Sequence, residues 1–428
     1  MLLKKLFRWF KKNKANSPKI IARAQHNISR NLISNNALKV LYRLHKAGFS
    51  AYLVGGCIRD LLLDKNPKDF DIATNAKPEQ LQDLFYNCRL IGRRFRLAHI
   101  HFGREIIEVA TFRAHNAEAL LQNMHGMILR DNVYGTIEQD VGRRDFTINA
   151  LYYNIADFSV IDFVDGMRDL EKKQINLIGD PELRYREDPV RMLRALRFAA
   201  KLGFTLHPRT ATPIFTLGPL LANIPAARIY EEYIKLFLLG HASDTYKLLC
   251  EYGLFKLLFP HAAVFADDRL IISALRSTDL RVKADKSVAP SFLLAVFGWQ
   301  ALLEQYQLNL AAGQSEFIAF DDAMEKIIRD QQKIMTVPRR LVNIVYDIWT
   351  AQQRLERRKS ARQIENTFAL TNFRAAYDFL LLRAENADKN AIAAAQWWKN
   401  YVDSDEAERK KLLTKIKQPK RKIKKKDS

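Results

Sequence analysis

The sequence predicts an α+β protein, with a small mixed sheet in its first half and an all-helical second half. Strand patterns alternate with helical patterns from Ser50 to about Phe163, as in a compact α/β unit. Strand alternation becomes scarce after Asp188, where amphipathic helical windows dominate as far as about Ala395. At 428 residues the chain is too long for one ordinary core. We therefore expect roughly two to four domains.

The first half begins with a helix, a strand and two short helices. A helical pattern over 36–47 ends at Gly48, and a strand pattern follows over 51–54. A helix-like run over 58–63 and a helix over 77–85 come next, the latter opened by Pro78. These segments predict one strand that passes through a turn directly into a helix.

The rest of the first half contains several strand patterns and one long insertion. The stretch 113–142 has weak periodicity and several polar residues, so we expect a long, mobile insertion there. Strands are expected at 90–92, 98–102 and 106–112, and strands or helices at 148–155 and 160–164.

The helical half begins with a strong capping signal. Asp188 and Pro189 suit an N-cap and a first helical turn, the apolar run 190–202 follows, and Gly203 ends it. Further amphipathic windows predict two helical subdomains, and they lie at 227–239, 245–258, 290–303 and 373–384.

These patterns divide the chain into five expected parts. They are a basic N-terminal arm (1–35), an α/β head (36–175), a helical neck (176–255), a helical body (256–405) and a basic tail (406–428).

Charge points to a polyanionic partner. The net charge is +22 and the pI is about 9.8, so the chain should attract nucleic acid, nucleotide phosphates or an anionic membrane. Its three cysteines, Cys57, Cys88 and Cys250, are scattered and lack metal-ligand spacing, which fits a reducing cytoplasm. No apolar run reaches the length of a membrane span.

Both terminal segments are strongly basic. In Met1–Lys14, apolar and basic residues alternate at roughly helical spacing, without the continuous apolar core of a signal peptide. The segment fits a short amphipathic helix in weak peripheral contact with an anionic membrane, or equally a flexible arm that contacts RNA. Lys420–Lys426 has almost nothing to bury, so we expect a disordered tail that binds RNA, or one that only aids solubility.

A glycine pair followed by two aspartates is the first candidate site. Gly55 and Gly56 allow a ligand close to the backbone, and the amides that open the next helix suit a phosphate. Asp69 and Asp71 share one face of an extended segment, where they could hold hard divalent cations such as Mg²⁺. Each motif alone has an ordinary alternative, a simple turn or a solvated loop. Together they favour a functional site, and a phosphate-binding turn beside a metal-binding pair is what nucleotidyl transfer would need.

Three further clusters carry charged groups at regular spacing. One is the arginine-dense stretch 91–99, which suits phosphate oxygens or forms a solvated hairpin. A second, 143–150, combines basic, acidic and amide groups, as a nucleotide or a charged helix cap would require. The third begins at Glu187, and its arginines form one ridge on a helix that either contacts a base edge or is solvated; they are Arg191, Arg194 and Arg197.

Taken in order, these motifs resemble the class II nucleotidyltransferases, which comprise tRNA CCA-adding enzymes and bacterial poly(A) polymerases. Four motifs at suitable spacing make the resemblance specific over roughly Leu53–Phe204, and weaker similarity continues through 224–228 and 373–378. The matching motifs are Gly55-Gly56-x-x-Arg59-Asp60, Asp69-x-Asp71, Arg144-Asp145-Phe146-Thr147-x-Asn149-Ala150 and Glu187-Asp188-x-x-Arg191-x-x-Arg194-Ala195.

Within the family, the polyadenylating branch fits better. The run 91–99, followed by Phe102, looks like the segment that marks that branch, and the basic tail and large helical half are also similar to it. CCA-adding relatives usually carry a Glu before the arginine of the fifth motif, whereas Ala227 precedes Arg228 here. The resemblance therefore implies transfer of AMP from ATP to RNA 3′ ends, such as those of mRNA, in RNA processing and decay.

The resemblance also implies roles for individual residues. Asp69 and Asp71 would hold Mg²⁺, and Asp145 would join the catalytic group, with Glu108 as another candidate for a third carboxylate. The implied nucleotide contacts are Gly55, Gly56 and Arg59 for the triphosphate, Arg144 and Asp145 for the ribose with Asn149 in the same motif, and Glu187, Asp188, Arg191 and Arg194 for the base.

Two alternatives stay open at this stage. The nearer is a tRNA CCA-adding enzyme, which would incorporate CTP and stop after one ATP. The other belongs to a different class: a non-catalytic RNA-binding protein that keeps the fold. RNA preference, processivity, oligomeric state and protein partners cannot be inferred from the sequence.

Overall fold

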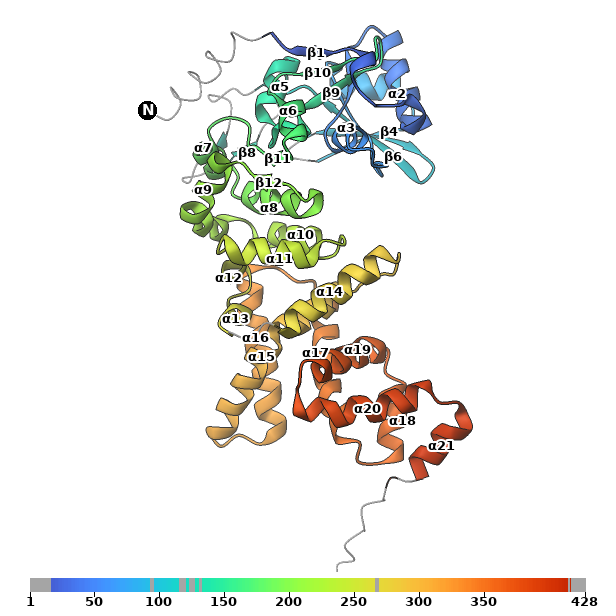
Figure 1. Cartoon of the computed structure of the whole chain (residues 1–428), viewed down its shortest axis with the longest axis vertical. Helices are drawn as coiled ribbons and strands as arrows, with labels where there is room; N and C mark the ends of the chain where they lie inside the picture. Colours follow the sequence, from blue (N-terminus) through green and yellow to red (C-terminus); the bar gives the residue numbers. More distant parts are fainter. Residues whose placement is uncertain are drawn as a thin grey trace, which may run out of the picture. The chain divides into compact units, whose positions relative to one another are not determined.

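The structure is a computed structural model that describes residues 17–92, 96–114, 121–122, 128–130, 133–265, 269–414 and 416. The chain divides into two compact units, Met1–Leu221 and Ala222–Ser428. Figure 1 shows the strands gathered in the first unit and helices throughout the second. The predicted α+β class, with a mixed-sheet head followed by a helical half, is confirmed.

An eight-stranded mixed sheet forms the first unit. Its strand order is β1-β10-β9-β2-β3-β6-β5-β4. β3 and β6 run parallel, whereas β2 is antiparallel to both of its neighbours, β3 and β9. The bounds are β1 Lys19–Ile21, β2 Ala51–Val54, β3 Asp71–Thr74, β4 Cys88–Ile91, β5 Leu97–Phe102, β6 Glu105–Thr111, β9 Leu151–Asn154 and β10 Val160–Asp162.

Short helices and small two-stranded pairs complete this unit. Two-stranded pairs join β7 to β8 and β11 to β12. Their bounds are β7 Leu121–Gln122, β8 Ile128–Arg130, β11 Gln174–Ile175 and β12 Thr205–Leu206. The helices are α2 Asn35–Lys46, α3 Gly56–Leu62, α4 Pro78–Leu84, α5 Ile137–Arg143, α6 Gly166–Glu171, α7 Pro181–Glu187, α8 Val190–Leu202 and α9 Pro208–Leu217, with 3₁₀ turns at Arg23–Gln25, Arg30–Leu32, Thr147–Asn149 and Gly218–Asn223.

Local signals predicted the elements around the site well. β2 has the bounds that the sequence predicts, and α8 covers the predicted run and ends at Gly203 in the left-handed region, with φ +69°. α3 begins at Gly56, two residues earlier than predicted, because Gly55 already acts as its N-cap. The N-cap of α8 is Pro189, one residue after the predicted Asp188, whose Oδ1 accepts a hydrogen bond from Val190 N at 3.3 Å.

Two elements differ from the sequence-based expectation. β1 lies inside the stretch expected to be an N-terminal arm, and it pairs with β10 at the edge of the sheet (Figure 1). The expected mobile insertion 113–142 ends in helix α5, which begins after Thr136 with a capping box formed with Gln139. Its apolar side packs on the sheet through Val141, which lies in a buried cluster with Val54 and Ala73. Residues 115–120, 123–127 and 131–132 lie outside the description.

The second unit consists of helices, as predicted. The expected single helix over 245–258 is divided at Gly253, where φ is +70° and α11 gives way to α12. The bounds are α10 Ala226–Phe237, α11 Ala242–Glu251, α12 Phe255–Leu258, α13 Pro260–Ala263, α14 Arg269–Lys283, α15 Pro290–Ala311, α16 Glu316–Ile334, α17 Arg339–Arg357, α18 Ala361–Phe368, α19 Phe373–Glu385, α20 Lys389–Asp403 and α21 Glu406–Thr414.

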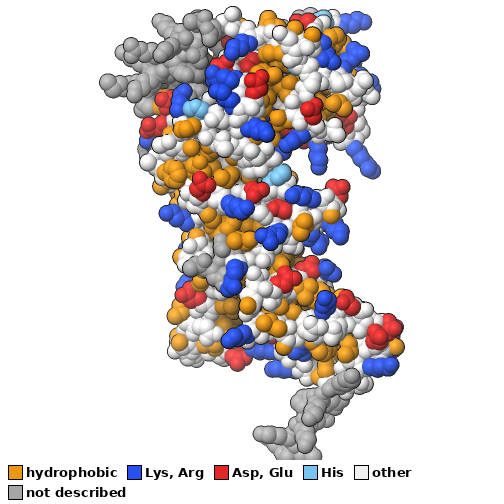
Figure 2. All heavy atoms as spheres, in the orientation of Figure 1, with side chains coloured by type: hydrophobic (Ala, Val, Ile, Leu, Met, Phe, Trp, Pro, Cys, Tyr) orange, Lys and Arg blue, Asp and Glu red, His pale blue; other side chains and the backbone are white. Residues whose placement is uncertain are grey.

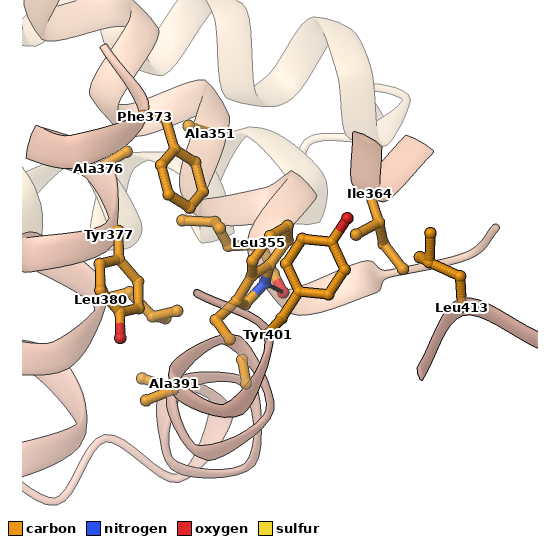
Figure 3. Packing of buried hydrophobic residues seen from close by; sticks show 13 residues of the cluster. Ala351, Leu355, Ile364, Phe373, Ala376, Tyr377, Leu380, Ala391, Tyr401 and Leu413 are labelled. Atoms are coloured by element: carbon orange, nitrogen blue, oxygen red, sulfur yellow. Dashed lines mark hydrogen bonds between the residues drawn. The ribbon is translucent and has the colours of Figure 1, made fainter. Parts of the chain in front are cut away.

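Aromatic packing holds the last helices together. Figure 3 shows Phe373, Tyr377 and Tyr401 directed into a cluster built from α17 to α21. Phe373 stacks on Tyr377 with ring centroids 5.7 Å apart, and buried Trp398 donates a hydrogen bond from Nε1 to Leu355 O at 2.9 Å. Burial of these large side chains supplies a core for this unit that is separate from the sheet.

No helix in the described ranges is long and apolar enough to cross a membrane. The predictions for the amphipathic segment Met1–Lys14 and for the tail Lys420–Lys426 lie outside the described residues.

Candidate active site

The glycine turn brings the backbone close to an acidic side chain. β2 ends at Val54, Gly55 takes φ +83°, and α3 follows at once. A Cβ added to Gly55 would lie 3.6 Å from Asp71 Oδ2 and 4.0 Å from Arg144 Nη1. Only glycine adopts this φ without strain. The turn therefore forms one wall of a corner that also contains a carboxylate and a guanidinium.

Asp71 is the first residue of β3, and Asp69 precedes it by two residues. Phe70, between them, is buried, while both aspartates are exposed, so the burial pattern alternates as in a strand. The hydrophobic side chain of Phe70 anchors this segment. This burial pattern fits their spacing, and Asp69 lies near enough to Asp71 to help raise the pKa of its carboxyl group.

Glu108 lies beside Asp71 in the sheet. β3 and β6 are in register, with Asp71 opposite Glu108, and Glu108 is in turn opposite His99 on β5. His99 Nε2 is 3.4 Å from Glu108 Oε1. Of the two candidates for a third carboxylate, Glu108 is therefore the one that the sheet register pairs with Asp71.

The corner concentrates negative charge. Part of the Asp71 side chain is accessible to solvent, but many protein atoms lie close to its carboxyl group. The resulting loss of hydration raises the pKa of Asp71 to about 6. Repulsion from Glu108 and Asp69 acts in the same direction, and Arg144 opposes it. A hard divalent cation would relieve this repulsion, because carboxylate oxygens are its preferred ligands. In the described ranges, no group of three or more His, Cys, Asp or Glu is already arranged to hold a metal.

Arg59 and Asp145 belong to a chain of hydrogen bonds beneath this corner. Arg59 is 2% exposed, donates from Nη1 to Asn149 Oδ1 at 2.7 Å, and also binds Asp60 Oδ1. Asn149 Nδ2 donates to Asp145 Oδ1 at 3.3 Å, and Arg194 donates to Asp145 Oδ2 through Nε and Nη2. The structure connects these four predicted residues, but it does not bring Arg59 to the surface.

The charge of Asp145 is strongly favoured. Burial alone would raise the pKa of Asp145, but Arg194 lowers it to about 2, helped by the backbone N–H of Phe146 and by Asn149. Because both carboxylate oxygens accept hydrogen bonds, Asp145 links the head to helix α8.

Arg144 is the guanidinium that faces the corner. It follows helix α5 and donates from Nε to Tyr152 OH at 2.8 Å and from Nη2 to Asp140 Oδ2 at 3.0 Å. Tyr152 OH donates to the same Asp140 oxygen at 2.7 Å. Although burial works against it, Tyr152 and Asp140 raise the pKa of Arg144 above its usual range.

Two arginines donate hydrogen bonds to the glutamate of the predicted base-reading motif. Glu187 Oε2 accepts hydrogen bonds from Arg191 Nη1 at 3.0 Å and from Arg184 Nη1 at 2.7 Å. Arg184 also donates from Nη2 to the carbonyl oxygens of Arg143 and Arg144. Glu187 is buried and Arg191 is 11% exposed, so the motif lies packed against the head.

The arginine-dense stretch is described only in part. Arg93, Arg94 and Phe95 lie outside the described residues. Arg96 Nη1 donates to Glu79 Oε1 at 3.0 Å in an exposed pair, whereas His99 lies beside Glu108. This stretch therefore ends at the acidic corner.

Sequence reasoning missed three residues that orient the site. Asp140, Tyr152 and Arg184 are buried polar or charged side chains that hold Arg144 or Glu187 in place. A helical spacing signal existed for two of them, because Asp140 precedes Arg144 by four residues and Arg184 precedes Glu187 by three. Nothing local marked Tyr152, which reads as an ordinary strand residue.

Comparison with known proteins matches three segments of the chain to related families. Residues 51–176 match the poly A polymerase head domain, 203–265 a probable RNA and SrmB-binding site of polymerase A, and 312–428 the polymerase A arginine-rich C-terminus. Poly(A) polymerase I of Escherichia coli O6:H1 is 49% identical over 93% of this chain and 88% of its own length. The chain belongs to the poly(A) polymerase I family.

Other relatives agree with this placement. Poly(A) polymerase I of Haemophilus influenzae is 47% identical over 92% of this chain and 90% of its own length. A CCA-adding enzyme of Lactobacillus helveticus is 36% identical, but over only 50% of this chain and 53% of its own length. The polyadenylating relatives therefore cover nearly the whole chain, whereas this more distant relative covers half of it.

Solved structures share the fold. The CCA-adding enzyme of Bacillus stearothermophilus in complex with CTP is 26% identical, with a TM-score of 0.57, and the match covers 84% of this chain and 80% of that one. The Thermotoga maritima CCA-adding enzyme complexed with tRNA has a TM-score of 0.60 at 20% identity, over 89% of this chain and 87% of that one. Members of the poly(A) polymerase I family thus share an architecture with CCA-adding enzymes.

Proposed function

We propose that this chain is a template-independent polynucleotide adenylyltransferase that adds AMP from ATP to RNA 3′ ends and releases pyrophosphate. The observation that carries the proposal is the corner where Gly55, Asp71, Glu108 and Arg144 meet, in a chain of the poly(A) polymerase I family. Carboxylates, a close backbone approach and a guanidinium are the groups that phosphoryl-group chemistry requires.

The metal that suits the corner is Mg²⁺, with Asp69 and Asp71 as ligands. The donors are hard oxygens, and the raised pKa of Asp71 reflects a charge density that a cation would neutralise. Glu108, opposite Asp71, is the third carboxylate that we favour. Mg²⁺ often takes only one or two carboxylates plus substrate phosphates, which fits the corner before nucleotide binds. When bound, Mg²⁺ would activate the 3′-hydroxyl and neutralise charge on the α-phosphate.

The reaction itself is an in-line displacement. The terminal 3′-oxygen of the RNA forms a bond to the α-phosphorus of ATP while the bond to the pyrophosphate oxygen breaks, and the hydroxyl proton passes to solvent. Gly55 leaves room for the phosphates beside Asp71, whereas a Cβ on Gly56 would lie 3.4 Å from Arg59 Nη2. Arg59, which is buried, acts on the site through Asn149. Positioning and charge stabilisation account for most of such catalysis.

The sugar and the base would lie toward helix α8. The Asp145–Arg194 pair, 32% exposed at Arg194, is placed to meet the ribose and so to favour ATP over dATP. Arg191, oriented by Glu187, and Asp188 would offer donors and acceptors to the edge of the adenine base. These side chains replace a nucleic-acid template.

RNA would run along the basic helical half. Figure 2 shows Lys and Arg side chains spread over the visible face of the described residues. The tail Lys420–Lys426 would add phosphate contacts, which appear as a smaller salt dependence of RNA binding when residues 417–428 are removed. If that removal leaves the salt dependence unchanged, the tail binds no RNA.

The remaining assignments rest on the sequence. We propose that the boundaries near residues 36, 176, 256 and 406 delimit arm, head, neck, body and tail. We place the activity in the cytoplasm, in keeping with the wide scatter of the three cysteines, Cys57, Cys88 and Cys250. We also propose a weak contact of Met1–Lys14 with anionic membrane. If deletion of that segment leaves binding to anionic liposomes unchanged, the segment makes no such contact.

Labelled nucleotides distinguish polyadenylation from CCA addition. The purified chain is incubated with ATP or CTP and either unstructured RNA or tRNA that lacks its 3′ end. We expect long adenylate tails from ATP on unstructured RNA and little incorporation of CTP. Efficient CTP addition to tRNA, with ATP addition that stops after one residue, would overturn the proposal in favour of a CCA-adding enzyme.

A further inference from the structure

Arg144 is held by two side chains that none of the motifs contains. Tyr152 OH accepts a hydrogen bond from Arg144 Nε at 2.8 Å and donates one to Asp140 Oδ2 at 2.7 Å. That Asp140 oxygen also accepts hydrogen bonds from Arg144 Nε at 3.2 Å and Nη2 at 3.0 Å. The guanidinium carbon lies 5.2 Å from the centre of the Tyr152 ring, close enough for a cation–π contact.

These two supports come from rigid, buried positions. Tyr152 is fully buried on β9, where it pairs with Val54, the last residue of β2 before Gly55. Asp140 is 9% exposed on α5, one turn before Arg144. A strand and a helix therefore fix the same guanidinium from two sides, which leaves it little rotational freedom.

Because Nε and Nη2 of Arg144 are held by these hydrogen bonds, the direction of the remaining nitrogen, Nη1, is also determined. Nε and Nη2 face Tyr152 and Asp140, whereas Nη1 points to Gly55, whose added Cβ would lie 4.0 Å from it. Asp71 Oδ2 lies 3.6 Å from that same Cβ position. Nη1 is thus directed at the space that glycine leaves open beside the carboxylates.

Arg59 is less suited to that space. Its guanidinium is 2% exposed and is occupied by Asp60 and Asn149, with its centre 5.2 Å from the Phe198 ring. Contact with a ligand would require these buried bonds to break, which is costly for a charged group. Arg144, 23% exposed, needs no such rearrangement.

We propose that Tyr152 and Asp140 are positioning residues that aim Arg144 at the phosphates of the incoming nucleotide. The inference rests on the proposed function of the same site and assigns the phosphate-binding guanidinium within it. A guanidinium fork binds phosphate oxygens best when its plane is fixed, because bidentate contacts depend on orientation.

The test measures affinity as a function of phosphate number. Tyr152→Phe keeps the ring but removes the hydroxyl group that aligns Arg144. We expect the full-length variant to bind ATP about tenfold more weakly, as for loss of one well-oriented charged contact, with a smaller loss for ADP and less than about a twofold change for AMP. Isothermal titration with ATP, ADP and AMP in a buffer containing Mg²⁺ gives the three values.

The control is the neighbouring tyrosine. Tyr153→Phe also removes a phenol from β9, but Tyr153 lies on the opposite face of the strand, where its ring meets His26 edge-on. It should bind all three nucleotides as the unchanged chain does. Asp140→Asn, which weakens the same support from the helix side, should reproduce the ATP-selective loss if Tyr152→Phe fails to fold.

Two outcomes would overturn the inference. Unchanged ATP affinity in folded Tyr152→Phe and Asp140→Asn would show that Arg144 needs no such support. An equal loss for ATP, ADP and AMP would show a structural role only. Failure of the proposed function is a separate result, since it appears as absent nucleotide incorporation by the unchanged chain.

Discussion

At the scale of single residues, the candidate site contains one carboxylate whose charge opposes folding and another whose charge favours it. Asp71 lies among Glu108 and Asp69, and burial together with their repulsion raises its pKa to about 6. Asp145 is the opposite case, because Arg194 lowers its pKa to about 2 despite burial. A carboxyl group with a raised pKa resists ionisation in the folded state, so the Asp71 carboxylate lowers the stability of the fold.

Asp71→Asn should therefore stabilise the metal-free protein and abolish its activity. The folded pKa of Asp71 exceeds its ordinary value of 3.8, so its destabilising effect appears as pH rises through that interval and is complete above about 6. Thermal unfolding with a chelator near pH 7.5 should show a higher Tm for the variant, and near pH 4 the two proteins should agree. A lower Tm at the higher pH would show that Asp71 is not electrostatically strained.

At the scale of elements, helix α8 joins the nucleotide motifs to one another. Arg191, Arg194 and Arg197 form the predicted ridge, and all three are half-buried. Arg191 binds Glu187, Arg194 binds Asp145, and Arg197 lies 4.7 Å from the Phe198 ring centre. The alternative of a solvated basic face does not describe this ridge, because its arginines contact partners in the first unit.

Arg194→Gln should weaken that attachment. Removal of the guanidinium leaves the Asp145 carboxylate half-satisfied, which should cost about 2 kcal/mol, less than for a fully buried pair. Because the pKa of Asp145 is lowered to about 2, the stabilisation is present above its ordinary value of 3.8 and is lost as pH falls toward 2. Denaturant unfolding should show the difference near neutral pH and a smaller one near pH 3.

A surface pair provides the matched control. Arg186 Nη2 lies 3.0 Å from Glu182 Oε1, and both side chains are largely exposed. Arg186→Gln should cost less than about 1 kcal/mol. Equal losses in the two variants would show that the Asp145–Arg194 pair contributes no more than an exposed ion pair.

At the scale of the whole molecule, the sequence predicted architecture better than contacts. The order of strand, glycine turn and helix around Gly55, and the capped helix α8, follow from local signals, and the structure has both. β1 and α5 were missed because each lies in a stretch with little hydrophobic periodicity. Their formation depends on long-range partners, β10 for the strand and the sheet face for the helix.

In the candidate site, too, local signals predicted some features, and others depend on long-range contacts. Residue types and spacing were enough to select Asp69 and Asp71 as candidates, because a two-residue spacing predicts a common face in an extended segment. Sheet register, which no local pattern encodes, places Glu108 opposite Asp71. Burial of Arg59 and the support of Arg144 by Tyr152 were equally beyond local signals, because both depend on residues that are distant in sequence. Tertiary contacts, and not the motifs, therefore determine which arginine is buried and which one faces the acidic corner.

The central claim is that the acidic corner of the first unit transfers AMP to RNA. The most direct test compares the unchanged chain with an Asp69→Ala, Asp71→Ala double variant, using ATP, Mg²⁺ and an unstructured RNA, with product length read on a denaturing gel. We predict extension by many adenylates for the unchanged chain and none for the variant, while RNA affinity at low salt stays within about twofold. Extension by the variant at the unchanged rate would contradict the account, and so would an unchanged chain that binds RNA but adds no nucleotide.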